Sequence, residues 1–158
     1  MKRDGRLSGV LHVLLHMAEQ DGPVTSEILA QAMQTNPVVI RRIMAGLREQ
    51  GYVASERGHG GGWRLARPLD QVTLADIYAA LGAPSLFAIG HRNADPQCLV
   101  EQSVNAALDG ALGEAEAVLL ASFANVTLAQ LSADFHARMV AHPHAHRDIP
   151  HDRHDDRG

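Results

Sequence analysis

Three arginines and a run of glycines lie close together in the segment RGHGGGWRLAR, residues 57–67. Arginine donates several hydrogen bonds to phosphate oxygens, and glycine has no side chain to keep a ligand away from the backbone. The segment can therefore approach a polyanion closely. A nucleotide-binding loop is the alternative, but the chain has no GxxxxGK[ST] pattern, and its glycines do not open a helix at GxGxxG spacing.

Cys98 is the one cysteine of the chain and a candidate redox sensor. Asp95 and Pro96 can cap a helix that begins beside it, which would place the thiol in the first turn, where the helix dipole favours thiolate. Such a thiol is open to oxidation to a sulfenic acid or a mixed disulfide. A buried cysteine that only packs is the alternative. Because iron-sulfur clusters need several thiolates, we expect no cofactor.

Half of the ten histidines lie in the C-terminal segment HPHAHRDIPHDRHDDRG. This segment has no periodic apolar face, so we expect residues 141–158 to be disordered. Its alternating histidines can bind nickel, copper or zinc, which makes a metal-responsive protein one interpretation and a functionally neutral tail the other. We assign no metal site, since nothing in the sequence selects His12, His16, His91 or Glu101 as further ligands.

The spacing of apolar residues predicts three helices before the glycine-rich segment. The first covers residues 7–18, the second begins near Thr25 or Ser26, and the third runs from Asn36-Pro37 to Gln50. The inward face of the third helix consists of Ile40, Ile43, Met44 and Leu47. Arginines occupy its other side, and two such helices joined by a tight turn are typical of a helix-turn-helix.

Strand-forming residues at 52–55 and 63–66 flank the glycines and predict a β-hairpin, which is a wing when it follows a helix-turn-helix. Arg57, Arg64 and His59 would then reach phosphates, and Trp63 would pack the hairpin base onto the helices.

Beyond the hairpin, Thr73 and Asp76 form a capping-box pattern that starts a helix. Helical periodicity returns from Gln97 with an apolar stripe, which we expect to pair with a second subunit; burial within one subunit is the alternative. Gly110 and Gly113 can bend this helix, and Thr127 can cap a last one. The predicted fold is mainly α with a small β-hairpin. Its divisions are a winged helix-turn-helix domain (1–82), a linker (83–96), dimerisation helices (97–140) and the tail (141–158).

Charge is uneven although the net charge is only -4. Residues 1–67 carry nine Lys/Arg against six Asp/Glu, and the remainder carries five against twelve. A polyanion would be drawn to the front part, although an uneven solvated surface explains the counts equally well. The sequence shows no signal peptide, no membrane-spanning run and no catalytic constellation, so we expect a cytoplasmic protein that is not an enzyme and has no membrane partner.

The run from Leu7 through the third helix, then LREQGYVASERGHGGGWRLARP and VTLADIYAALG, resembles the Rrf-two (Rrf2) family of winged helix-turn-helix regulators, which includes IscR, NsrR and CymR. Trp63 stands where many members have tyrosine. The resemblance implies a homodimer on a palindromic operator in double-stranded DNA, with the third helix in the major groove and the wing in the minor groove. The DNA-facing residues that it implies are Thr35, Asn36, Val38, Arg41, Arg42, Arg57, Gly58, His59 and Gly60.

Cys98 is similar in position to the thiol of the single-cysteine branch of this family, which lacks the three-cysteine cluster motif. The sequence therefore predicts a DNA-binding transcription repressor that responds to a small oxidant or thiol through Cys98. The alternatives are a metal- or small-ligand-responsive regulator of the same fold and a winged-helix protein-interaction module.

Overall fold

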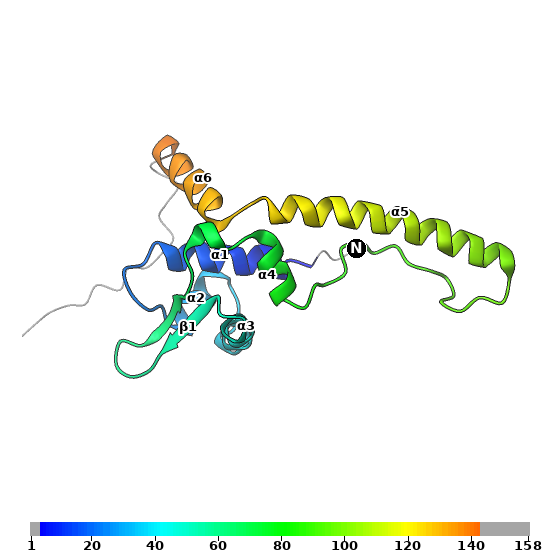
Figure 1. Ribbon diagram of the computed structural model, residues 1–158. Coiled ribbons are helices and arrows are strands. Elements are labelled where there is room, and N and C mark those ends of the chain that lie inside the picture. Colours follow the sequence, from blue (N-terminus) through cyan, green and yellow to red (C-terminus); the bar gives the residue numbers. More distant parts are fainter. Residues whose placement is uncertain (1–3, 143–158) are drawn as a thin grey trace, which may run out of the picture.

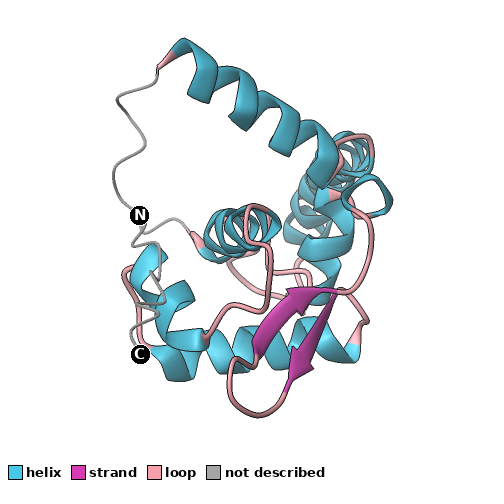
Figure 2. Ribbon diagram, turned by 90° about the vertical axis from the view of Figure 1, so that its left-hand side faces the viewer, coloured by secondary structure: helices cyan, strands magenta, loops and turns pink. Residues whose placement is uncertain are grey.

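The computed structural model describes residues 4–142 and shows a helical chain with one small hairpin (Figure 1, Figure 2). In chain order the elements are α1 (Arg6–Ala18), α2 (Ser26–Ala32), α3 (Pro37–Glu49), β1 (Val53–Glu56), β2 (Gly62–Leu65), the 3-10 helix η1 (Leu69–Gln71), α4 (Leu74–Ala80), α5 (Leu99–Ala124) and α6 (Leu128–Ala141). The predicted fold class, a winged helix-turn-helix followed by a long C-terminal helix, is confirmed.

Side chains cap both helices of the helix-turn-helix. Thr25 Oγ1 accepts a hydrogen bond from the backbone N–H three residues on, at 3.3 Å, so Thr25 rather than Ser26 starts α2. Asn36 Oδ1 accepts the N–H two residues on at 2.8 Å, with Pro37 in the first turn of α3. Gln34 between them has a φ of 51°, and this left-handed residue turns the chain from α2 into α3.

The hydrophobic core lies where α1, α2, α3 and α4 meet the hairpin. Val10 of α1 and Ile40 of α3 are completely buried, and each such side chain stabilises the fold by about 1.5–3 kcal/mol. On the predicted inward face of α3, Ile40, Met44 and Leu47 are buried, and Ile43 packs against them at the edge. The rest of the α3 surface is consequently free to face solvent.

β1 and β2 are antiparallel, with Val53 opposite Leu65 and Glu56 opposite Gly62. Each strand is displaced by one residue toward the hairpin tip from the limits predicted, 52–55 and 63–66. The displacement arises because Gly62, which has little strand propensity of its own, pairs with the other strand.

The hairpin is fixed to the helix-turn-helix through Trp63. Its backbone exchanges two hydrogen bonds of 2.8 Å with Val24, and its indole N–H donates to Ser26 Oγ at 2.9 Å. Beside it, a Cβ on Gly62 would lie 2.6 Å from the Val24 carbonyl oxygen, which is too close for any side chain. Only glycine therefore fits at this position. Trp63 therefore holds the base of the hairpin against the helices, as predicted.

α4 begins with the predicted capping box. The Asp76 N–H donates to Thr73 Oγ1 at 3.2 Å, and the Thr73 N–H donates to Asp76 Oδ2 at 2.8 Å. Tyr78 of α4 is buried and stands edge-on to Phe123 of α5, with ring centroids 6.0 Å apart. α4 thus connects the N-terminal helical core to the long helix.

α5 extends away from the rest of the molecule (Figure 1), and none of its 26 residues is buried. It begins at Leu99, two residues later than predicted, and it runs without interruption past Gly110 and Gly113. Residues 83–98 form no helix or strand, and two side-chain amides of α5 donate hydrogen bonds to their backbone carbonyls.

α6 returns to the N-terminal core and packs on α1 and η1. Its cap is Thr127, as predicted, and Leu128 is only 1% exposed within the core. The Leu128 N–H donates to the Val72 carbonyl at 2.8 Å, which ties the start of α6 to the segment before α4. The domain limits drawn from the sequence stay predictions. Within residues 4–142, no helix combines the length and apolar character needed to cross a bilayer.

Candidate nucleic-acid interface

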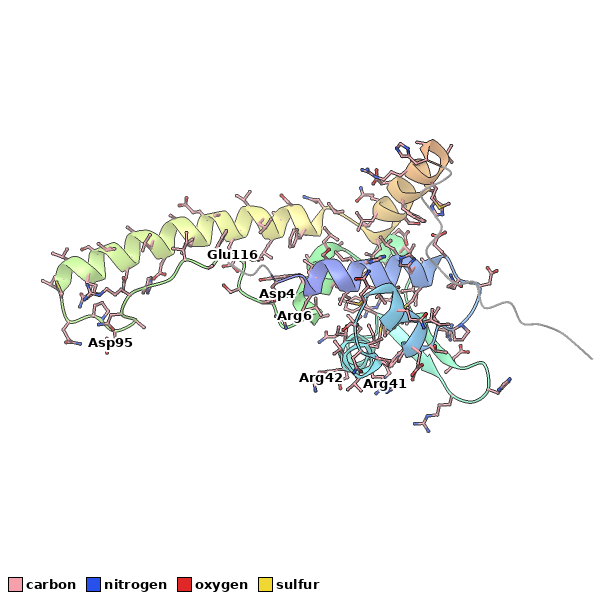
Figure 3. All side chains as sticks on the ribbon, turned by 180° about the vertical axis from the view of Figure 1, so that it is seen from behind. Asp4, Arg6, Arg41, Arg42, Asp95 and Glu116 are labelled. Carbon is pink, nitrogen blue, oxygen red and sulfur yellow. The ribbon has the colours of Figure 1, made fainter. Side chains whose placement is uncertain are left out.

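The outer face of α3 carries an exposed set of apolar and basic side chains. Val38 is 57% exposed, and Arg41 and Arg42 are exposed next to it. Figure 3 shows both arginines on the side of the molecule away from α6, with α3 seen almost end-on. Because the apolar positions of α3 face the core, the basic positions between them must face outward.

The N-terminal turn of α3 offers a second group of polar atoms. Asn36 is exposed, and its side-chain oxygen is engaged in the helix cap, which leaves its amide N–H groups as the donors available to a partner. Thr35 is half-buried, and its backbone N–H donates to the Ala30 carbonyl at 2.9 Å. The structure thus places all five predicted helix residues on or beside one surface of α3.

The wing tip is built from exposed residues in which glycines alternate with basic side chains. Gly58 and Gly60 have φ values of 97° and 77°, in the region that glycine adopts most easily. Arg57 and His59 alternate with them and are exposed. The tip therefore presents one guanidinium and one imidazole on a backbone that a ligand can approach closely.

Two predicted arginines have acidic partners that sequence reasoning missed. Arg41 pairs with Glu27 of α2 at 2.5 Å, and Arg64 pairs with Glu56 across the hairpin at 2.6 Å. All four side chains are about half exposed, so each pair contributes only about 0–1 kcal/mol to stability. No local sequence signal identifies Glu27, which lies 14 residues before its partner.

Cys98 is exposed and occupies the N-cap position of α5 without a capping hydrogen bond from its side chain, so Asp95 is not the cap and the thiol precedes the first turn. The backbone N–H groups of Glu101 and Val100 at the start of α5 lower the pKa of the thiol. The first residues of α5 lie at the end of the molecule remote from α3 and the wing (Figure 1). Within one chain, Cys98 therefore does not join the residues predicted to face DNA.

The other candidate ligands do not gather around Cys98. His91 pairs with Asp109 at 2.9 Å, and Glu101 lies in the first turn of α5 without forming part of a metal-binding group in the described residues. His12 and His16 lie on α1, against α6. Of the histidine-rich segment, only His142 falls within the described residues, where it caps the end of α6; the predicted tail from residue 143 lies outside them.

The family model described as Rrf2, iron-dependent transcriptional regulator, matches residues 4–134. The chain belongs to the Rrf2 family. YwnA of Bacillus subtilis (strain 168), named as an HTH-type transcriptional regulator, is 34% identical over 107 residues, which are 67% of this chain and 78% of YwnA. IscR of Photobacterium profundum is 31% identical over 91 residues, 58% of this chain and 52% of that protein.

Solved structures share the Rrf2 fold. A Lactobacillus plantarum protein described as a transcriptional regulator has a TM-score of 0.70 and 28% identity, covering 89% of this chain and 95% of its own. IscR of T. potens has a TM-score of 0.62 over 88% of this chain and 92% of its own; at 22% identity this likeness shows the fold alone. The chain is thus a DNA-binding transcriptional regulator of a family that consists of regulators rather than enzymes.

The iron named in the Rrf2 description raises the question of a cluster. Cys98 is the one cysteine in the sequence, and no group of three or more histidine, cysteine or acidic side chains that could hold a metal exists within residues 4–142. Iron-sulfur clusters are held mainly by cysteine thiolates. The residues present do not fit such a cluster, and the absence of a cofactor stays a prediction.

Proposed function

We propose that this Rrf2 protein is a homodimeric repressor that binds a palindromic operator and responds to oxidants through Cys98. In this proposal α3 enters the major groove and the wing enters the neighbouring minor groove. The single observation that carries it is that α3 and the hairpin tip lie on one side of the molecule. Both carry exposed arginines, and neither set of arginines is buried in the core.

The exposed surface of α5 supports the homodimer. Val100, Val104 and Val118 are 73%, 51% and 69% exposed. They share one side of the helix, because Val100 and Val118 are separated by about five turns and Val104 and Val118 by about four. A second copy of the same helix would cover these side chains, and a two-fold dimer places two α3 helices on two half-sites.

DNA binding is tested by fluorescence anisotropy with DNA from upstream of the gene of this protein. Arg42→Ala should weaken binding and reduce the slope of log affinity against log salt by about one, because one phosphate contact is lost. Arg138→Ala, which removes an equal charge from exposed α6, should leave both quantities unchanged. Equal effects of the two changes would contradict the placement of α3 on DNA.

The lowered thiol pKa and the exposure of Cys98 support the redox part of the proposal. Hydrogen peroxide would convert the thiolate to a sulfenic acid, with release of hydroxide, and a second thiol would then form a disulfide with release of water. The second thiol comes either from Cys98 of the other subunit or from a small thiol. Oxidation should change operator affinity in the native protein and leave Cys98→Ser unaffected; an unchanged response in that variant would contradict this role.

A further inference from the structure

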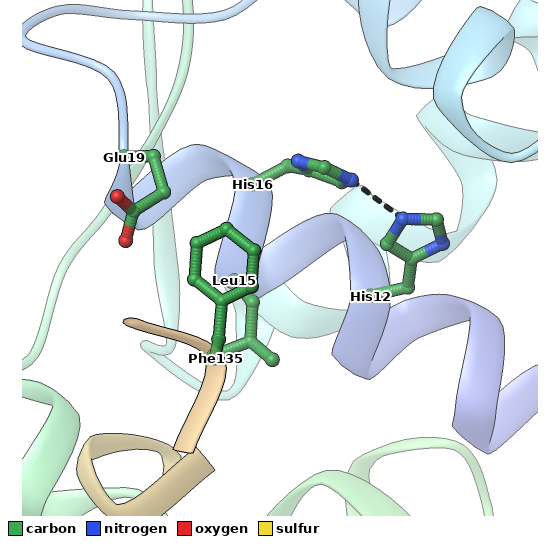
Figure 4. Close-up of a pocket in the computed structure, with 5 residues that line it drawn as sticks. All are labelled: His12, Leu15, His16, Glu19 and Phe135. Atoms are coloured by element: carbon green, nitrogen blue, oxygen red, sulfur yellow. Dashed lines mark hydrogen bonds between the residues drawn. The ribbon is translucent and has the colours of Figure 1, made fainter. Parts of the chain in front are cut away.

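Two imidazoles meet on the outer face of α1. His12 and His16 lie one helical turn apart, with Nε2 atoms separated by 2.5 Å and ring centroids by 4.4 Å (Figure 4). His12 is exposed and His16 is half-buried. The two ring nitrogens therefore converge on one point that solvent can reach.

In this arrangement one neutral imidazole can donate its Nε2–H to the Nε2 lone pair of the other ring. A metal cation can take the place of that proton and bind both nitrogens. Zinc-nitrogen bonds of about 2.0–2.1 Å at a tetrahedral angle set two ligand nitrogens about 3.3 Å apart. The rings need to separate by less than about 1 Å to reach that distance, which rotation of the exposed His12 ring can supply.

A pocket of about 200 Å³ lies beside the pair, lined by His12, Leu15, His16, Glu19 and Phe135. Phe135 comes from α6 and stands between the imidazole pair and Glu19 (Figure 4). Glu19 accepts a hydrogen bond from His136 at 3.0 Å, which holds α6 over α1. Glu19 is thus occupied in positioning α6, and the apolar side chains of Leu15 and Phe135 limit water on one side of the nitrogens.

We propose that His12 and His16 bind one divalent transition-metal ion of the nickel, copper and zinc class in this pocket. Imidazole nitrogen is a ligand that suits these ions, and histidines four residues apart on a helix face the same side. Water completes the coordination, since no third histidine, cysteine or acidic ligand joins the pair within residues 4–142. The site is separate from Cys98, which lies at the far end of α5.

The test must separate this site from the histidines at the C-terminus. The background protein is the full chain with glutamine in place of the five histidines at positions 142, 144, 146, 151 and 154. Calorimetric titration with Ni²⁺ should give one ion per chain. Adding His12→Gln and His16→Gln should lower the affinity by about tenfold or more, by analogy with the cost of disturbing metal sites. His59→Gln with His91→Gln, an equal loss of histidines elsewhere, should not lower it.

Two results would overturn the proposal: equal nickel affinity of the background protein and the His12/His16 variant, or an equal loss in the His59/His91 control. A second measurement leaves both histidines in place and so does not depend on the folding of a variant. Nitrogen-15 NMR of the background protein with Zn²⁺ should shift the Nε2 resonances of His12 and His16 while that of His59 stays unchanged. Unshifted His12 and His16 resonances at saturating Zn²⁺ would equally exclude the site.

Discussion

At the scale of single residues, ion pairs decide how strongly the predicted arginines can act on DNA. Arg41 and Arg64 each face a carboxylate in the free protein, whereas no ion pair involves Arg42 or Arg57 within the part of the chain described. A phosphate must compete with Glu27 or Glu56 for its arginine, and each carboxylate also repels the DNA backbone. The basic surface is therefore weaker than the count of its arginines indicates.

Replacing Glu27 with glutamine should tighten DNA binding. The change removes a surface ion pair worth about 0.2–1 kcal/mol and one repulsive charge, so we expect about two- to fivefold higher affinity at low salt. Anisotropy titrations at several salt concentrations measure this effect. Glu49→Gln, which removes a charge from the other end of α3, is the matched control. Weaker binding by the Glu27 variant would mean that the pair instead orients Arg41 for a base contact.

The thiol of Cys98 should react at lower pH than an ordinary cysteine. Backbone N–H groups at the start of α5 stabilise its thiolate, so its pKa is lowered in the folded state only. Alkylation by iodoacetamide, followed against pH, should have its midpoint below that of the same protein in urea. Coinciding midpoints would show that the helix start does not activate the thiol.

At the scale of elements, helices whose signals are local could be predicted from the sequence. Thr25, Asn36, Thr73 and Thr127 all cap helices, because each cap depends on residues two or three positions away. The hairpin limits depend on pairing between two strands, and the start of α5 depends on which of several residues takes the N-cap position. Both differ from the prediction, so Cys98 lies at the N-cap rather than in the first turn. The outward face of α3 could be located from its apolar period, whereas Glu27 and Glu56 as arginine partners could not.

The side-chain hydrogen bond between Trp63 and Ser26 should strengthen the attachment of the wing beyond its backbone bonds to Val24. Trp63→Phe and Ser26→Ala each remove it, and each should lower the free energy of unfolding by about 1–3 kcal/mol, since a polar group is left unpaired in a partly buried position. The double variant should lose less than the sum of the two. Urea unfolding of all four proteins measures this coupling, and strict additivity would show that the bond contributes nothing.

At the scale of the whole molecule, α5 extends from a compact core and carries an apolar surface that the rest of the described chain leaves exposed. α4 and residues 83–98 contact one side of α5, while its three valines remain exposed on another. Exposed apolar side chains gathered on one helix are typical of a protein-protein interface.

Charges on that side of α5 should produce a monomer. Val104→Glu with Val118→Glu places two like charges from each subunit in the proposed interface, and desolvating them opposes association. Sedimentation equilibrium should change from a dimer to a monomer, and operator affinity should fall at least about tenfold because one half-site is lost. Ala106→Glu with Ala117→Glu, on another side of the same helix, should remain dimeric. A dimeric valine variant would place the subunit contact elsewhere.

The return of α6 has a consequence for how the protein is made. Leu128 fills the core between α1 and the segment before α4, yet the ribosome adds it only after the whole of α5. The DNA-binding part of a nascent chain therefore lacks one of its internal side chains until synthesis is nearly complete. A chain interrupted within α5 would hold every residue predicted to face DNA and still expose the apolar surface of α1 to water. Such a fragment would be a substrate for chaperones and proteases rather than a free competitor for DNA.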